Sequence, residues 1–180
     1  MNYYGGKELA ASFRTVRKNT ITIAEELPAE AYAKPLAPGM RTVGQVLTHI
    51  AVMYRLQHQV HHVQPVKTLV GFDFPTLFGT LMAEEQKPRD KAAIIALLKE
   101  EGEKCGNWLA GISDAALGEM VEMPAGASPA AKSRFEMILS IKEHEMHHRG
   151  QLMLLQRMIG VVPHLTRQFQ ERMAQAASRS

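Results

Sequence analysis

Residues 144–148 (HEMHH) match H-E-x-x-H, the pattern of zinc peptidases. In those enzymes the two histidines bind zinc, the glutamate polarises a zinc-bound water, and a third ligand follows further along the chain. The metzincin extension of the pattern needs a glycine where this sequence has Gln151, and no histidine follows before His164. Glu171 is a downstream glutamate, but it belongs to a short C-terminal tail. The sequence therefore disfavours a peptidase.

His144 and His148 are one turn apart and, at about 100° per residue, fall on one helical stripe. The other members of that stripe are Met137, Ile141, Leu152, Leu155 and Ile159. His147 lies about 100° from His148 and is expected to face the flank of the helix or the solvent. Glu145 lies at the side of the stripe, where it is a weak candidate for a general base. We interpret it more simply as a solvated helix glutamate.

Two imidazoles inside an aliphatic stripe need partners, because an unpaired buried polar group costs about 1–3 kcal/mol. One metal ion would satisfy both rings, and the i, i+4 spacing brings their nitrogens within reach of a single ion. The alternative that the pattern leaves open is that the rings lie at the edge of the stripe and bond to backbone or water. A third ligand would come from another helix. His49 is the best candidate, because it lies beside the apolar edge of the second predicted helix.

The other histidines and the single cysteine are weaker candidates. His58, His61 and His62 lie near the end of the second predicted helix, where the helix dipole favours imidazolium. The simpler interpretation is that these three side chains are exposed to solvent, and the alternative is that they form a second site. His164 has no evident partner. Cys105 lies among charged residues with no histidine nearby, so we expect a plain surface or half-buried thiol rather than a nucleophile.

Hydrophobic periodicity predicts four long helices, at about residues 6–27, 42–62, 90–111 and 133–159. Capping boxes at Thr42–Gln45 and Ser133–Glu136 mark two of the helix starts. The connection over residues 62–90 is long for a bundle, and FPTLFGTLMAEE within it is expected to form a short helix. Residues 121–131 are expected to form a mobile loop. The predicted fold class is all-α, a four-helix bundle with a long crossover between helices 2 and 3.

Length and composition limit the remaining possibilities. The 180 residues, 46% hydrophobic and 22% charged, predict one globular domain over residues 1–180. A net charge of +3, without blocks of Lys and Arg interleaved with aromatics, disfavours a nucleic-acid partner. The uncharged apolar runs are far too short to span a membrane, so we expect no membrane partner. A single cysteine and an N-terminus without a secretory apolar region lead us to expect a cytoplasmic protein.

Two segments, TVGQVLTHIA and EHEMHHRGQLMLLQRMIGVVP, resemble the DinB/YfiT-like superfamily, and the resemblance covers nearly the whole chain. It implies a four-helix bundle, often dimeric, that binds one divalent transition metal, Zn or Ni, through three histidines. Carried over by position, those ligands are His49, His144 and His148. Arg149 and Gln151 match the motif of this superfamily, but the sequence gives no role for them. Arg149 is a candidate partner for a carboxylate on a neighbouring helix.

The resemblance also implies an enzyme that acts on a small-molecule substrate, because members of this superfamily include enzymes that use low-molecular-weight thiols as cosubstrates. The first hypothesis is a thiol-dependent S-transferase or isomerase that acts on a small electrophile. The alternatives are a metal-dependent hydrolase on the same three histidines, or a non-catalytic bundle that binds metal or ligand as a homodimer. An all-imidazole site suits Zn, Ni, Cu or Fe, and its neutral ligands would leave the ion able to acidify a bound water or thiol.

Overall fold

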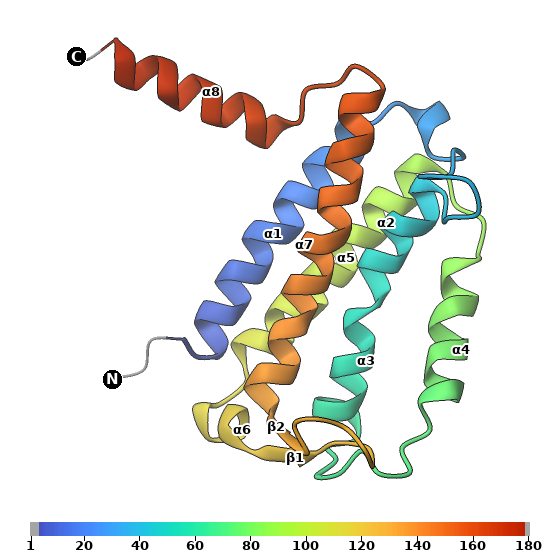
Figure 1. The fold of residues 1–180 in the computed structure, drawn as a ribbon, viewed down its shortest axis with the longest axis vertical. Helices are drawn as coiled ribbons and strands as arrows, with labels where there is room; N and C mark the ends of the chain where they lie inside the picture. The colour runs from blue at the N-terminus through green and yellow to red at the C-terminus, as the bar shows by residue number, and fades with distance from the viewer. Residues whose placement is uncertain (1–3, 179–180) are drawn as a thin grey trace.

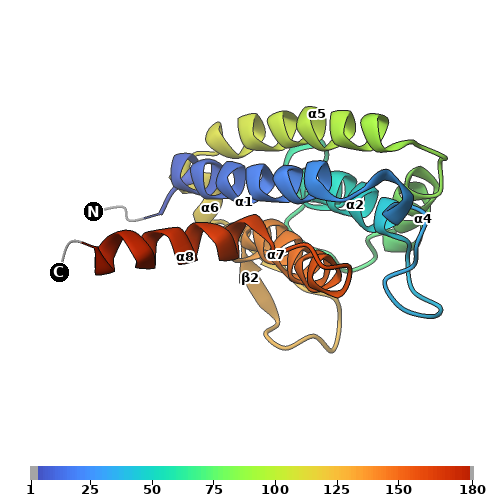
Figure 2. The ribbon, with the colours of Figure 1, turned by 90° about the horizontal axis from the view of Figure 1, so that it is seen from above.

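The computed structural model describes residues 4–178, in which four long helical segments pack side by side (Figures 1 and 2). These segments are α1 (Gly6–Glu26), α2 (Val43–Val52) continued by α3 (Tyr54–His58), α5 (Lys91–Ala110) and α7 (Arg134–Met158). Helices α5 and α7 each pack against both α1 and α2. The prediction of an all-α four-helix bundle is confirmed.

The long crossover contains α4 (Phe74–Glu85), which coincides with the predicted FPTLFGTLMAEE helix. Asp73 caps it by accepting a hydrogen bond from the backbone N–H of Thr76 at 3.1 Å. Helix α4 packs against the outside of α2 and carries the chain back to the end where α2 begins, so α5 runs in the same direction as α2 (Figure 1). The crossover thereby adds a wall beside α2, and its last residue, Glu85, is buried.

Local capping chemistry starts the helices where the sequence predicts. Thr42 and Gln45 form a reciprocal capping box, with hydrogen bonds of 3.2 and 2.9 Å between each side chain and the backbone of the other. The second predicted box forms through its serine alone: Ser133 Oγ accepts from the N–H of Glu136, whose carboxylate pairs with Lys132 instead. At the other end of α7, Gly160 has a φ of +82°, which a residue without Cβ adopts without strain.

The second predicted helix is divided. Helix α2 ends at Val52, α3 begins at Tyr54, and the segment closes with η2 (Gln59–Val63), a π-helical turn. The expected loop at residues 121–131 also differs, because its ends form the short antiparallel strands β1 (Met120–Glu122) and β2 (Ala131–Ser133), with Val121 opposite Lys132. Strands of three residues are too short to show an alternating pattern in the sequence.

The expected C-terminal tail is a helix, α8 (His164–Ala177), which extends away from the end of α7 (Figure 1). Its apolar residues Leu165, Phe169 and Met173 are spaced by four, a helical signal that the sequence carried. The remaining short elements are η1 (Ala29–Ala31), a 3₁₀ turn, and α6 (Asp114–Gly118). None of the described helices combines the length and apolarity needed to cross a bilayer.

Candidate metal centre

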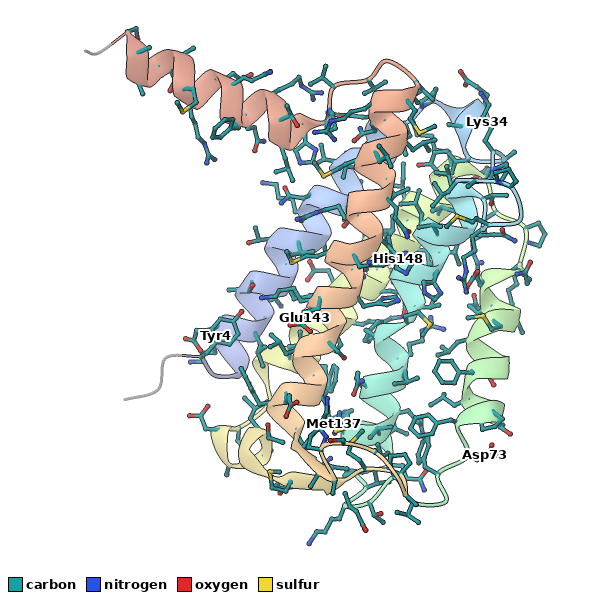
Figure 3. All side chains as sticks on the ribbon, viewed as in Figure 1. Tyr4, Lys34, Asp73, Met137, Glu143 and His148 are labelled. Carbon is teal, nitrogen blue, oxygen red and sulfur yellow. The ribbon has the colours of Figure 1, made fainter. Side chains whose placement is uncertain are left out.

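Three histidines from two helices converge inside the bundle. His49 comes from α2 and is 6% exposed, while His144 and His148 lie one turn apart on α7 and are half-buried. The Nε2 atom of His144 lies 3.1 Å from Nε2 of His49 and 3.2 Å from Nε2 of His148. Figure 3 shows His148 on the side of α7 that faces α2. Within residues 4–178, these are the one group of three potential ligand side chains whose ligand atoms all lie within 4.8 Å of one another.

Neighbouring side chains set the tautomers of two of these rings. His49 Nδ1 lies 2.9 Å from a carboxylate oxygen of Glu85, which only accepts, so Nδ1 carries the proton and Nε2 keeps its lone pair. His148 Nδ1 lies 2.9 Å from Gln151 Oε1, with the same result. The amide of Gln151 is held in this orientation because its nitrogen donates to His147 Nε2 at 3.3 Å. Gln151, which had no role in the sequence, thus orients His148.

This arrangement fits a divalent metal ion. The Nε2 lone pairs of His49 and His148 face the Nε2 atom of His144. A proton on that atom could be donated to only one of these lone pairs, whereas a metal ion would bind all three nitrogens. Zinc–nitrogen bonds of 2.0–2.1 Å in a tetrahedral site place ligand nitrogens about 3.3 Å apart, close to the two distances from His144 Nε2. Burial, together with the neighbouring imidazoles, lowers the pKa of His144 to about 4, so the ring is neutral and ready to bind metal at pH 7.

The carboxylate behind His49 was not found from the sequence. Glu85 is 3% exposed, accepts from His49 Nδ1 and forms an ion pair with Arg41. A carboxylate on the far nitrogen of a ligating histidine holds the ring in place and makes it a better donor. Glu85 ends the crossover helix, 36 residues after His49, and no local pattern relates the two positions.

Glu145 is not the solvated glutamate that the sequence predicted. Its carboxylate is 2% exposed and binds Arg17 through three contacts of 3.0–3.1 Å. The same guanidinium donates to the carbonyl oxygens of Leu98 and Ile50, each at 3.0 Å, so it links all four long helical segments. Both carboxylate oxygens are held by Arg17, which leaves Glu145 unsuited to accept a proton from a substrate or water. Arg149, the predicted carboxylate partner, forms no ion pair with a described residue.

The other histidines do not add a second group of three potential ligands within the described chain. His61 is half-buried with its Nδ1 2.9 Å from Arg134 Nη1, so the prediction that this ring is exposed to solvent is wrong. His58 and His62 lie against one another with ring centroids 4.7 Å apart, and both contact Trp108.

His164 and Cys105 are both buried, and neither adjoins the three-histidine group. His164 lies at the start of α8 with Nε2 3.3 Å from Asn19 Oδ1. Cys105 is fully buried in α5, which corrects the expected surface or half-buried position. Burial raises the pKa of its thiol, so it is not a reactive nucleophile.

Comparison with known proteins extends these observations. The model of the DinB superfamily matches residues 12–152. In fold, the chain is similar to YfiT from Bacillus subtilis, with a TM-score of 0.66, 15% identity, and coverage of 89% of this chain and 91% of that one. That protein is described as "a probable metal-dependent hydrolase with an unusual four-helix bundle topology".

Two further structures share the fold. An uncharacterised protein from Clostridium difficile 630 matches with a TM-score of 0.64 and 13% identity, over 88% of this chain and 99% of that one. A DinB-like protein from Bacillus cereus ATCC 10987 matches with a TM-score of 0.51 and 18% identity, over 87% and 93%. No curated protein matches the sequence. Since the family model spans most of the chain, including all three clustered histidines, the protein belongs to the DinB superfamily.

Proposed function

We propose that this protein is a metal-dependent enzyme that binds one divalent transition metal, Zn or Ni, through His49, His144 and His148. The observation that carries the proposal is the convergence of three Nε2 atoms, two of which are held as lone-pair donors by Glu85 and Gln151. Three neutral ligands leave open coordination positions and the full charge of the ion, which would lower the pKa of a bound water or thiol.

The residues around the centre support hydrolysis as the first reaction class. A cavity of about 360 Å³ adjoins His144, a size that suits one small substrate molecule. Glu145 lines this cavity, but Arg17 holds both of its carboxylate oxygens, so the protein offers no free carboxylate there to act as base. Activation of the nucleophile would then depend on the three-histidine centre. The likeness to a protein described as a probable metal-dependent hydrolase also favours this class.

Transfer of a small thiol to an electrophile, or thiol-dependent isomerisation, is the second candidate. It is supported by the all-imidazole donor set, since nitrogen ligands tolerate a soft thiolate as the additional ligand. Both candidates need the same three histidines and differ in the nucleophile. A substrate screen therefore separates them.

The first experiment measures metal content. Protein purified without a nickel column should contain about one Zn or Ni per chain, and His148→Ala should lose it. His147→Ala is the matched control, because His147 is exposed and adjacent but contributes to the centre only through Gln151. Equal metal content in wild type and His148→Ala would contradict the proposal. Metal-loaded protein is then assayed with small esters and amides, and with low-molecular-weight thiols plus electrophiles.

We also propose that the protein forms a homodimer through α8. Helix α8 has 14 residues, too few for stability in water without packing of its apolar face. Phe169 and Met173 on that helix are 63% and 56% exposed, and Leu154 and Met158 near the end of α7 are also exposed. In a dimer with a two-fold axis, the exposed apolar residues of α8 and of the end of α7 would be covered by the same residues of the second copy. Light scattering after chromatography should give a dimer mass, and Phe169→Glu with Met173→Glu should give a monomer.

A further inference from the structure

The cavity beside His144 has a lining that is mainly apolar. It lies between α2 and α3, the crossover helix α4 and α7, with a volume of about 360 Å³. Its apolar lining residues are Ile50, Met53, Leu56, Phe78 and Ile141. Apolar walls with a few fixed polar groups are typical of a small-molecule site, so the orientation of each polar group indicates what the site would recognise.

Two polar residues of the lining have their polar atoms committed elsewhere. The Tyr54 hydroxyl donates to Glu101 at 3.1 Å. The Glu145 carboxylate is held by Arg17, and the charges of this buried pair balance. The cavity therefore has no uncompensated charge from these groups, and a cationic ligand would lose its hydration without gaining a counter-ion.

A chain of hydrogen bonds fixes the amide of Gln57, another lining residue. Arg134 Nη1 can only donate, so His61 Nδ1, at 2.9 Å, accepts, and the ring carries its proton on Nε2. That proton is donated to Gln57 Oε1 at 3.0 Å. At the other end, Ser140 Oγ donates to the Met137 carbonyl at 2.5 Å and accepts from Gln57 Nε2 at 3.3 Å. Both ends of the chain require the same amide orientation.

One donor remains available at the cavity. One N–H of Gln57 is used by Ser140, and the other has no acceptor in the described part of the chain. The lining thus offers an N–H donor from Gln57 and apolar walls, while the oxygen atoms of Gln57, Ser140 and Tyr54 already have hydrogen-bond partners.

We propose that this cavity is the substrate pocket of the metal centre, and that it binds a small uncharged molecule with an apolar body and a carbonyl oxygen that accepts from Gln57. This rests on the proposed function, since it places the carbonyl compound beside His144, one of the three proposed metal ligands. A neutral amide, ester or ketone has the required chemistry, and Gln57 is a residue that determines specificity for it.

The proposal is tested by binding, which does not depend on turnover. The probes are 4-phenylbutan-2-one and 4-phenylbutylamine, which share a phenyl-alkyl body but are neutral and cationic, respectively. Zinc-loaded protein is titrated with each probe by ligand-observed NMR. The neutral ketone should bind saturably, and the cationic probe should bind at least tenfold more weakly.

Two variants test the residues. Gln57→Glu keeps an acceptor for His61 but removes the donor, and should weaken ketone binding about three- to tenfold, as loss of one neutral hydrogen bond does. Met53→Trp should fill the cavity and abolish binding. Gln64→Glu is the matched control, because Gln64 is exposed and does not line the cavity, and it should bind the ketone as wild type does. Zinc content should remain at one per chain in all three variants.

The outcomes distinguish a failure of the proposed pocket from a failure of the proposed reaction. Ketone binding that depends on Gln57 and Met53, without turnover of any ester or amide, would support the pocket and count against hydrolysis. Ketone binding unchanged in both variants would overturn the proposal, as would tighter binding of the cationic probe. Absence of zinc from the wild type would refute the metal centre itself, which the zinc measurement reports separately.

Discussion

Replacing Glu145 by Gln tests whether this residue of the H-E-x-x-H sequence stabilises the fold or takes part in catalysis. The structure shows a buried pair in which Arg17 and Glu145 are 3% and 2% exposed and make three contacts of 3.0–3.1 Å. Gln keeps the shape of the side chain but removes the charge that balances the guanidinium. Breaking a buried pair by altering one partner costs about 3–5 kcal/mol, because it leaves the other charge uncompensated.

The measurement is the free energy of unfolding, from urea denaturation followed by circular dichroism. For a chain of this size each kcal/mol shifts Tm by about 2–4 °C, so thermal unfolding of Glu145→Gln should show a Tm roughly 6–20 °C below that of wild type. Glu143→Gln is the matched control on the same helix, since Glu143 is exposed (labelled in Figure 3) and should change stability by less than about 0.5 kcal/mol. The double variant Arg17→Met with Glu145→Leu should regain much of the loss, because no unpaired charge remains.

A Glu145→Gln protein with the stability and metal content of wild type, but without activity, would refute this reasoning. That result would mean that Arg17 does not need the carboxylate and that Glu145 acts on the substrate, as the glutamate of zinc peptidases does. Loss of stability in Glu145→Gln, with unchanged metal content in the folded fraction, would support the structural role.

Three further predictions concern the centre and acid stability. Glu85→Gln should weaken zinc binding about 10- to 100-fold, measured by competition with a chelator, because His49 loses its carboxylate; unchanged affinity would contradict this role. Added zinc should raise the Tm of wild type and His147→Ala but not of His148→Ala, and chelation should reverse the rise. Burial raises the pKa of Glu101, but hydrogen bonds from Arg55 and Lys104 outweigh this effect and lower the pKa to about 2. Since this folded pKa lies below the unfolded value, the stability from Glu101 is present above about pH 4.5 and lost as pH falls towards 2. Unfolding free energies at pH 5 and pH 3 should therefore differ less in Glu101→Gln than in wild type.

Local signals in the sequence predict most of the fold. The helical periodicity of α1, α5 and α7, the capping box at Thr42 and the glycine at residue 160 are all local, because helix hydrogen bonds and caps join residues three or four apart. The short helix α4 was predicted for the same reason. The segments that differ are short or were interpreted as a tail: the division of the second helix into α2, α3 and η2, the strands β1 and β2, and α8.

The sequence alone also selected the three histidines. His144 and His148 share a stripe through their spacing of four, and His49 lies beside the apolar edge of its own helix. The convergence of their Nε2 atoms depends on how α2 packs against α7, a contact between residues 95 positions apart.

The tertiary structure decided what surrounds those histidines. Arg17 pairs with Glu145 across 128 residues, Glu85 reaches His49 across 36, and Arg134 orients His61 across 73. None of these pairs has a fixed spacing in sequence, because each joins different elements whose relative positions follow from packing. Side chains that look solvated in a helical pattern, such as Glu145, are buried when a neighbouring helix supplies the opposite charge. The literal peptidase pattern is thus resolved into two histidines of the centre and a glutamate that holds the bundle together.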